Sequence, residues 1–164
     1  MRSSRFFWVP ATLSAGATVL HSLVTTTYVL PVASPDQASV LIGMKAIEHV
    51  IAANGVAPYI GNLLPFFVLA CLSCWVSLLA SRWRWTSVAT AVVAALLYRL
   101  LLQVTVVPDS ASGDDRVVSG IAGLVSAVEV FGIGSVMLQG LGYTLLFLLP
   151  ILASRLFLER RRVA

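Results

Sequence analysis

Hydrophobic residues are arranged in long continuous runs rather than in short alternating segments. Four such runs occupy residues 7–30, 57–80, 87–107 and 136–157. Each is close to the length of about 20 apolar residues that a helix needs to cross a bilayer. Helices also satisfy their own backbone hydrogen bonds in lipid, which isolated strands cannot do. The pattern predicts an all-α, polytopic membrane protein: a single four-helix transmembrane domain over residues 1–164.

Two of the connections between these runs are themselves apolar. Residues 40–53 place apolar side chains at a helical period, and residues 117–134 are apolar apart from Ser119, Ser126 and Glu129. Both predict short helices at the outer leaflet. For the second connection, the alternative is that it continues into the fourth run as one long bent helix.

Composition supports lipid as the solvent of this surface. The chain is 59% hydrophobic and 11% charged, with a mean hydropathy of +0.93. A soluble domain typically has about 25% charged residues. The net charge of +4 comes without a basic face rich in aromatic residues, so nucleic acid is not an expected partner. The expected partners are the lipid bilayer and a lipophilic small molecule, and a homo-oligomer is left open.

Basic residues gather at both ends of the chain and between the second and third runs, whereas the few charged residues of the other two connections are mainly acidic. Short loops rich in Lys and Arg stay on the cytoplasmic side of a membrane. This distribution predicts an integral membrane protein with cytoplasmic N- and C-termini. The alternative for the first run is a cleaved signal peptide, with Arg2 and Arg5 before it and a cleavage site near Ser34.

The chain carries signs of an internal duplication. The shift that places Glu48 on Glu129 also matches three further identical pairs: Ala46 with Ala127, Gly61 with Gly142, and Phe66 with Phe147. Pro31 and Pro108, which begin the two connections, fall outside that register and require a small insertion. The matches predict a tandem repeat with halves 1–83 and 84–164, both running in the same direction through the membrane.

Ionisable residues near hydrocarbon are the main candidates for chemistry, because a charge there is costly unless it is paired or functional. Glu48 and Glu129 lie in the two apolar connections, and Arg99 lies in the third run, about 13 Å from its end at Pro108. The candidate catalytic residues are Glu48, Glu129, Arg99, His49 and His21. The carboxylates would act as acid and base, and Arg99 would anchor an anion. In the structural alternative, Arg99 only pairs with one of the two carboxylates.

Polar residues in the runs follow helical spacing toward the same outer half of the membrane. Thr18, His21, Thr25 and Tyr28 form one such stripe, and Gln103 lies four residues after Arg99. These positions predict a polar pocket that opens to the outer leaflet. The candidate substrate-binding residues are Tyr143, Gln103, Gln139, Tyr28 and Asn54.

Metal and redox chemistry are alternatives that the sequence leaves open. Cys71 and Cys74 have the C-x-x-C spacing of redox and metal sites, but also suit two small buried residues one turn apart. His21, His49 and the two carboxylates are possible ligands of a transition metal or, for the histidines, of haem. No nucleotide-binding or hydrolase motif is present. No metal site or cofactor is assigned.

One segment resembles a known family. Tyr28-Val-Leu-Pro31, the stretch from Gly43 to Ile51 around Ala-Ile-Glu48-His49, and Val56-Ala-Pro58 are similar to small four-span anthrone-oxygenase-like membrane proteins over about residues 15–70. The resemblance implies oxidation of an aromatic, polyketide-like substrate without an obvious bound cofactor. It assigns no catalytic residue, and after the third run the chain lacks the Asn-Pro-type motif of that family.

The leading hypothesis is a small integral-membrane enzyme, of the oxygenase, isomerase or cyclase class, that acts on a lipophilic substrate by acid/base chemistry. An oligomeric transporter or channel that uses the acidic pair is the alternative. An accessory subunit of a larger membrane complex is a third.

Overall fold

The described part of the chain contains four helices that are long and apolar enough to cross a membrane. The computed structural model describes residues 2–29, 40–80, 84–108 and 115–163. The long helices are α1 (Arg2–Thr25), α3 (Ala57–Leu79), α4 (Arg84–Leu97) with its continuation η2 (Tyr98–Leu102), and α5 (Gly120–Val163). Their apolar stretches are Phe6–Thr25, Tyr59–Leu79, Trp85–Leu102 and Gly132–Leu158. The predicted helical, four-span membrane fold is confirmed.

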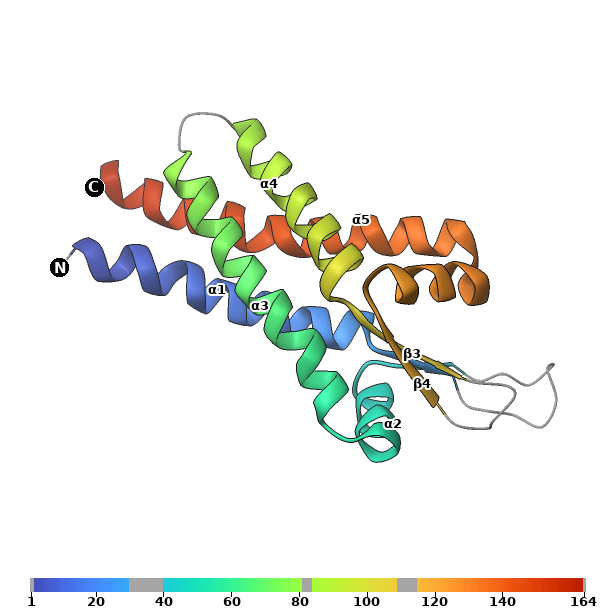
Figure 1. Cartoon of the computed structure of the whole chain (residues 1–164). Coiled ribbons are helices and arrows are strands. Elements are labelled where there is room, and N and C mark those ends of the chain that lie inside the picture. The colour runs from blue at the N-terminus through green and yellow to red at the C-terminus, as the bar shows by residue number, and fades with distance from the viewer. Residues whose placement is uncertain (1, 30–39, 81–83, 109–114, 164) are drawn as a thin grey trace.

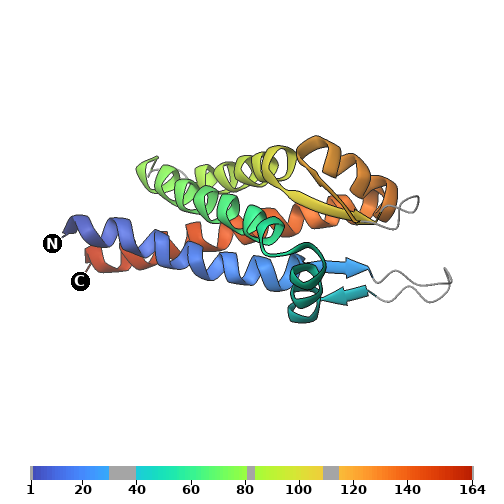
Figure 2. The ribbon, with the colours of Figure 1, turned by 60° about the horizontal axis from the view of Figure 1, so that its bottom comes forward.

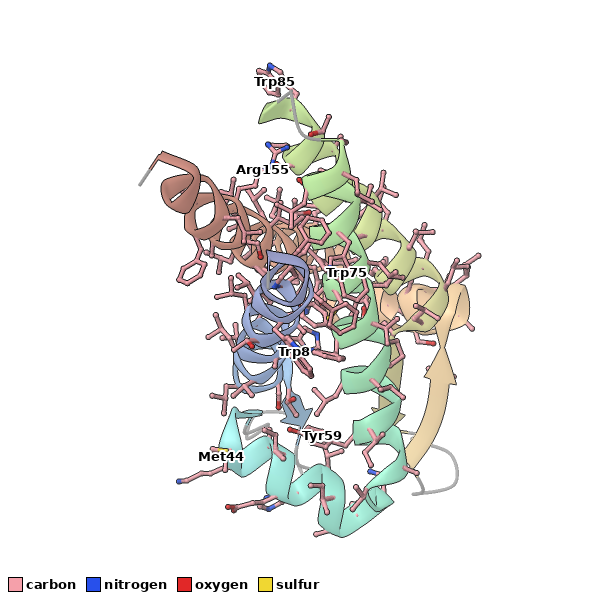
Figure 3. The ribbon with its side chains drawn as sticks, turned by 90° about the vertical axis from the view of Figure 1, so that its left-hand side faces the viewer. Trp8, Met44, Tyr59, Trp75, Trp85 and Arg155 are labelled. Atoms are coloured by element: carbon pink, nitrogen blue, oxygen red, sulfur yellow. The ribbon has the colours of Figure 1, made fainter. Side chains whose placement is uncertain are left out.

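The bundle has two distinct ends. Figure 1 shows both termini at one end and the β-strands at the other. Figure 2 shows α1 alongside α5, with α3 and α4 above them. Seen from the left-hand side of Figure 1, Trp85 and Arg155 lie toward the top of the molecule and Met44 and Tyr59 toward the bottom (Figure 3). We call the end that carries the strands the hairpin end.

Two of the spans end earlier than predicted. The helix α1 stops at Thr25 and η2 stops at Leu102, not at residues 30 and 107. The residues that follow form strands β1 (Thr27–Val29) and β3 (Val104–Pro108), which pair antiparallel with β2 (Val40–Ile42) and β4 (Asp115–Ser119). Apolar runs do not by themselves separate helix from strand. The β-branched Val and Thr residues of these segments favour the strand.

Short helices follow both hairpins. They are α2 (Met44–Asn54) and residues 120–131 of α5, so helix was predicted correctly there, but residues 40–42 and 117–119 are strand. At Gly132 the backbone leaves the helical region, with φ 77° and ψ 156°. The chain reverses at that point (Figure 1). The alternative of one long bent helix is therefore wrong, because a break separates the two parts of α5.

The two halves of the chain have the same order of elements: long helix, hairpin, short helix, long helix. Glycines with positive φ begin and end the short helix in each half. Gly43 and Gly55 have φ of 69° and 74°, and Gly120 and Gly132 have φ of 60° and 77°. A single sequence shift places Gly43 on Gly120 and Gly55 on Gly132, and we call it the glycine register.

The turn before each short helix is built from the same contacts. The amide of Gly43 donates to the carbonyl oxygen of Thr26 at 3.2 Å, and the amide of Gly120 donates to that of Gln103 at 3.1 Å. The glycine register also places Thr26, the acceptor in the first half, on Gln103, the acceptor in the second. A Cβ atom would lie 3.2 Å from a backbone oxygen of the preceding helix at Gly43, and 3.1 Å at Gly120. Positive φ and close backbone approach both require glycine here.

Aromatic and small side chains fill the centre of the bundle. Phe66, Tyr98, Phe147 and Ile151 are fully buried. The small residues between them let the helices approach closely, as in other membrane bundles. These small buried residues include Ser14, Ala17, Ala70, Cys74, Ala91 and Ala94. The surface carries mainly exposed leucine and valine, which suits contact with lipid.

At the end that carries the termini, Arg155 of α5 joins three long helices. Its Nη2 atom donates to the carbonyl oxygen of Ser77 in α3 at 2.9 Å and to the hydroxyl of Thr86 in α4 at 3.5 Å. The hydroxyls of Ser77 and Ser87 hydrogen-bond to each other at 3.0 Å. This end of the bundle is therefore closed by polar contacts among α3, α4 and α5.

Candidate functional site

His21 of α1 lies inside the bundle with its side chain 2% exposed. Its ring stacks on Phe66, with ring centroids 4.1 Å apart and planes inclined by 22°. The rings of Tyr98 and Tyr143 each lie 5.4 Å from it. Neither ring nitrogen has a hydrogen-bond partner among the described residues. The imidazole is thus a buried polar group in an aromatic surrounding that leaves its hydrogen-bonding capacity unused.

Arg99 is the second buried ionisable group, with 7% of its surface exposed. Its Nη2 atom donates to Oε1 of Gln139 at 3.2 Å. Its Cζ atom lies 5.4 Å from the ring centroid of Tyr143, within the range of a cation–π contact. The Nη1 atom is buried and has no partner among the residues that the structure describes. The described residues therefore hydrogen-bond to only part of this guanidinium.

Tyr143 of α5 is a neighbour of both groups. Its side chain is 3% exposed, and its ring contacts both His21 and Arg99. Its hydroxyl accepts a hydrogen bond from Nε2 of Gln103 at 3.0 Å. Side chains from α1, from α5 and from the end of the third span thus form one group. We call His21, Arg99, Gln103, Gln139 and Tyr143 the Arg99 cluster.

Arg99 is carried by a π-helical turn. The amide of Gln103 donates to the carbonyl oxygen of Tyr98, five residues earlier, at 2.7 Å. Such turns are rare and occur often at functional sites. Because the helix ends at Leu102, Arg99 lies within one turn of its end. The predicted depth of about 13 Å, counted from Pro108 at 1.5 Å per residue, was therefore wrong.

The glycine register shows what the other half of the chain carries at the same places. It relates Arg99 to Ser22, Gln139 to Asn62, and Tyr143 to Phe66. Ser22 and Phe66 are buried, like their counterparts. The hydroxyl of Ser22 hydrogen-bonds to that of Tyr59. The fold thus accommodates a small neutral residue where the second half has arginine.

The other ionisable candidates lie on the short helices. Glu48, His49 and Glu129 have exposed side chains on the two short helices. Nδ1 of His49 lies 3.0 Å from the carbonyl oxygen of Lys45. Glu129 borders an open, apolar hollow whose other lining residues are Leu124, Val125 and Val128. Within the described ranges no ion pair joins either carboxylate to Arg99, whose bonded partner is the amide of Gln139.

Two further candidates come from the first hairpin and the short helix after it. Asn54 ends α2, and Tyr28 lies in strand β1, with its side chain outside the described parts of the structure. The predicted site residues therefore separate into two sets. Five of them form the Arg99 cluster, in which Gln139 is exposed at the bundle surface, and the others lie on the short helices and the hairpin.

Two aromatic residues of the site were not predicted. Tyr98 is fully buried against His21 and donates its hydroxyl hydrogen to the carbonyl oxygen of Asn62 at 3.2 Å. Phe66 supplies the ring on which His21 stacks. The glycine register relates Tyr98 to His21 and Phe66 to Tyr143. Pro31 and Pro108 are related by the same sequence shift as the glycines. Aligning the two halves on these prolines would have placed Tyr98 and Phe66 opposite the predicted site residues His21 and Tyr143.

The cysteines and the metal alternative involve other parts of the bundle. Cys71 and Cys74 are buried free thiols, and Sγ of Cys74 lies 3.8 Å from the hydroxyl oxygen of Ser14. In the described ranges no three or more His, Cys, Asp or Glu side chains are grouped so as to hold a metal ion.

The chain matches no protein-family model, no curated protein and no solved structure. The resemblance to anthrone-oxygenase-like proteins therefore stays a prediction, and any function has to be argued from the cluster itself.

Proposed function

We propose that this protein is an integral-membrane enzyme that acts on a lipophilic molecule by acid/base chemistry at the Arg99 cluster. The observation that carries the proposal is a pair of buried side chains, His21 and Arg99, that each lie 5.4 Å from the Tyr143 ring and have nitrogens without a hydrogen-bond partner among the described residues. Buried polar groups are normally hydrogen-bonded. Two exceptions around one ring point to a ligand that supplies the missing partners.

A purely structural role explains only part of Arg99. The bond to Gln139 ties η2 to α5, but an amide or hydroxyl could do the same. An ionisable side chain inside a membrane span is costly unless it is paired, reaches the interface or has a function. Ser22, at the corresponding position, meets the needs of the fold without a charge. The arginine is therefore better explained by a bound molecule than by packing.

His21 is the proposed proton acceptor and donor. A neutral imidazole offers one donor and one acceptor nitrogen, and the described residues use neither. It can take a proton from a bound substrate and return it at another position. Gln103 and Tyr143 would orient the substrate beside it. Glu48 and Glu129, exposed on the short helices, have no part in this centre.

A transporter is the second candidate. The shared order of elements, the four matched glycines and the matching turn contacts support a tandem duplication. Parallel repeats of this kind occur in transporters, with sites at the repeat interface. Both termini lie at one end of the bundle (Figure 1), and the basic residues there favour the cytoplasmic side.

The test begins with native mass spectrometry of the full chain extracted in mild detergent, followed by identification of the released small molecules. We expect the wild type to carry a lipophilic molecule, and Arg99→Gln and His21→Phe to lose it or fail to convert it. Ser22→Ala is the matched control, because it changes the corresponding position of the other half. Thermal unfolding of each variant reports whether it is folded.

Three outcomes separate the candidates. Conversion of the bound molecule by the wild type, but not by folded His21→Phe, supports the enzyme. Flux of that molecule into liposomes without conversion supports the transporter. If the wild type carries no lipophilic molecule, or if folded Arg99→Gln carries and converts it as the wild type does, the Arg99 cluster is not the site.

A further inference from the structure

We infer that the molecule bound at the Arg99 cluster is an amphiphile whose head is an oxyanion, either a carboxylate or a phosphate. The inference rests on the proposed site and names the class of its ligand. Its first support is charge. Among the described residues, the guanidinium donates its side-chain hydrogen bond to the neutral amide of Gln139. A buried cation that no carboxylate of the described residues pairs with favours an anion from outside the chain.

The geometry of the guanidinium indicates the kind of anion. One nitrogen, Nη2, is already directed at Gln139, and the neighbouring Nη1 is buried with both of its hydrogens unused. The planar fork of arginine matches a group that presents two oxygens, as carboxylates and phosphates do. A neutral alcohol or ketone would leave the charge uncompensated. A cationic amphiphile would be repelled.

The surroundings of Arg99 indicate that the ligand has an apolar body. Gln139, its partner, is exposed on the bundle surface. Leucines flank the pair on both helices, with Leu96 53% exposed, Leu100 36% and Leu138 70%. An apolar chain can lie against these side chains while its head reaches Arg99. The position of Arg99 within one turn of the helix end is also the depth at which amphiphile heads meet hydrocarbon.

The two halves of the chain supply an internal comparison. Both have a buried polar position at the end of the outgoing helix, but Ser22 is satisfied by Tyr59 and Arg99 is left partly unsatisfied. The π-turn also occurs only in the half with arginine, within the described residues. The cation and the altered backbone thus coincide at one of two corresponding places. This coincidence favours a ligand over a requirement of the fold.

The experiment measures binding of probes with one chain length and different heads to the full protein in a non-ionic detergent. The probes are dodecanoate, dodecyl phosphate, dodecanol and dodecyltrimethylammonium, with acetate and inorganic phosphate as heads without a chain. Binding is followed by the shift in thermal unfolding and by competition against the best probe. We expect dodecanoate or dodecyl phosphate to bind, and the neutral, cationic and chainless probes to bind at least about tenfold more weakly.

Variants then locate the binding. Arg99→Gln should lower the affinity for the anionic probe at least about tenfold. Arg99→Lys, which keeps the charge but lacks the planar fork, should lower that affinity less. Lys45→Gln is the matched control, because it removes an exposed positive charge from α2. If Arg99→Gln does not fold, the head selectivity of the wild type still decides the matter.

Each result has one meaning. Equal binding of dodecanol and dodecanoate overturns the inference, as does unchanged binding by folded Arg99→Gln. Equal binding of acetate or inorganic phosphate also overturns it, because the ligand would then be a free anion. The proposed function fails separately: an anionic amphiphile that binds at Arg99 but is never converted contradicts the enzyme and leaves the ligand class intact.

Discussion

The two halves of the bundle share a backbone plan and differ in chemistry. Each half has a long helix, a hairpin, a short helix between two positive-φ glycines, and a second long helix. In the first half the buried polar contacts are neutral, as between Ser22 and Tyr59. In the second half the corresponding region holds Arg99, Gln139 and the Gln103–Tyr143 hydrogen bond on a π-helical turn.

The comparison separates what the fold needs from what it merely permits. Features found in both halves, such as the turns at Gly43 and Gly120, are requirements of the fold. Features found in one half, above all the partly unsatisfied Arg99, are additions that the fold can do without.

The matched turns should be equally sensitive. Gly43→Ala and Gly120→Ala should each lower the free energy of unfolding by about 1–3 kcal/mol, because both place a Cβ in a glycine-only backbone region beside a carbonyl oxygen. Equilibrium unfolding in detergent micelles measures the loss. Gly16→Ala is the control, because its Cβ would meet open space within α1. Strongly unequal losses would break the equivalence of the two halves.

Replacing Arg99 with methionine should stabilise the ligand-free protein, by about 1 kcal/mol, because an uncompensated charge is removed from an apolar site. The same unfolding assay applies. Arg155→Met should act in the opposite direction, because Arg155 donates to Ser77 and Thr86. A clear loss of stability in folded Arg99→Met would show that the arginine serves the fold.

The hydrogen bonds Gln103–Tyr143 and Ser22–Tyr59 should contribute similar free energies to the stability of the folded protein. A double-mutant cycle of Gln103→Ala and Tyr143→Phe should give a coupling energy near 0.6 kcal/mol, the average found for such bonds between membrane helices. The cycle of Ser22→Ala and Tyr59→Phe in the first half should give about the same value. A much larger coupling in the second half would assign that bond to a wider polar network.

The smallest effect is expected at the acidic residues. Glu48→Gln and Glu129→Gln should each change the free energy of unfolding by less than about 0.5 kcal/mol, because both side chains are exposed. Turnover of the bound molecule should also persist. If either folded variant loses turnover completely, the chemistry belongs to the acidic pair, as the sequence alone suggested.

The helical part of the fold was predictable because length and hydrophobicity determine which segments can cross a bilayer. The ends of α1 and η2 were not, because Val104 and its neighbours continue the apolar run while favouring extended backbone. A tandem repeat was predicted in the register of Glu48 and Glu129. The glycines support the register of Pro31 and Pro108 instead.

Part of the site followed from spacing. His21, Arg99 and Tyr143 stand out as polar positions in apolar helices, so the sequence finds them. Tyr98 does not stand out, because aromatic residues are common in apolar helices and its contact with His21 is known only from the structure. The exposure of Glu48 could not be predicted, because sequence does not reveal which face of a short helix packs. In α2 the packed face is Ala46, Ile47 and Val50.

Arg155 has a consequence for how the protein is made. Membrane proteins are synthesised from the N-terminus, so α3 and α4 leave the ribosome before α5. Until α5 is inserted, Ser77 and Thr86 lack the donor that later joins them. The contact therefore marks completion of the bundle. A chain whose synthesis stops before Arg155 would leave α3 and α4 without the contact that joins them to α5.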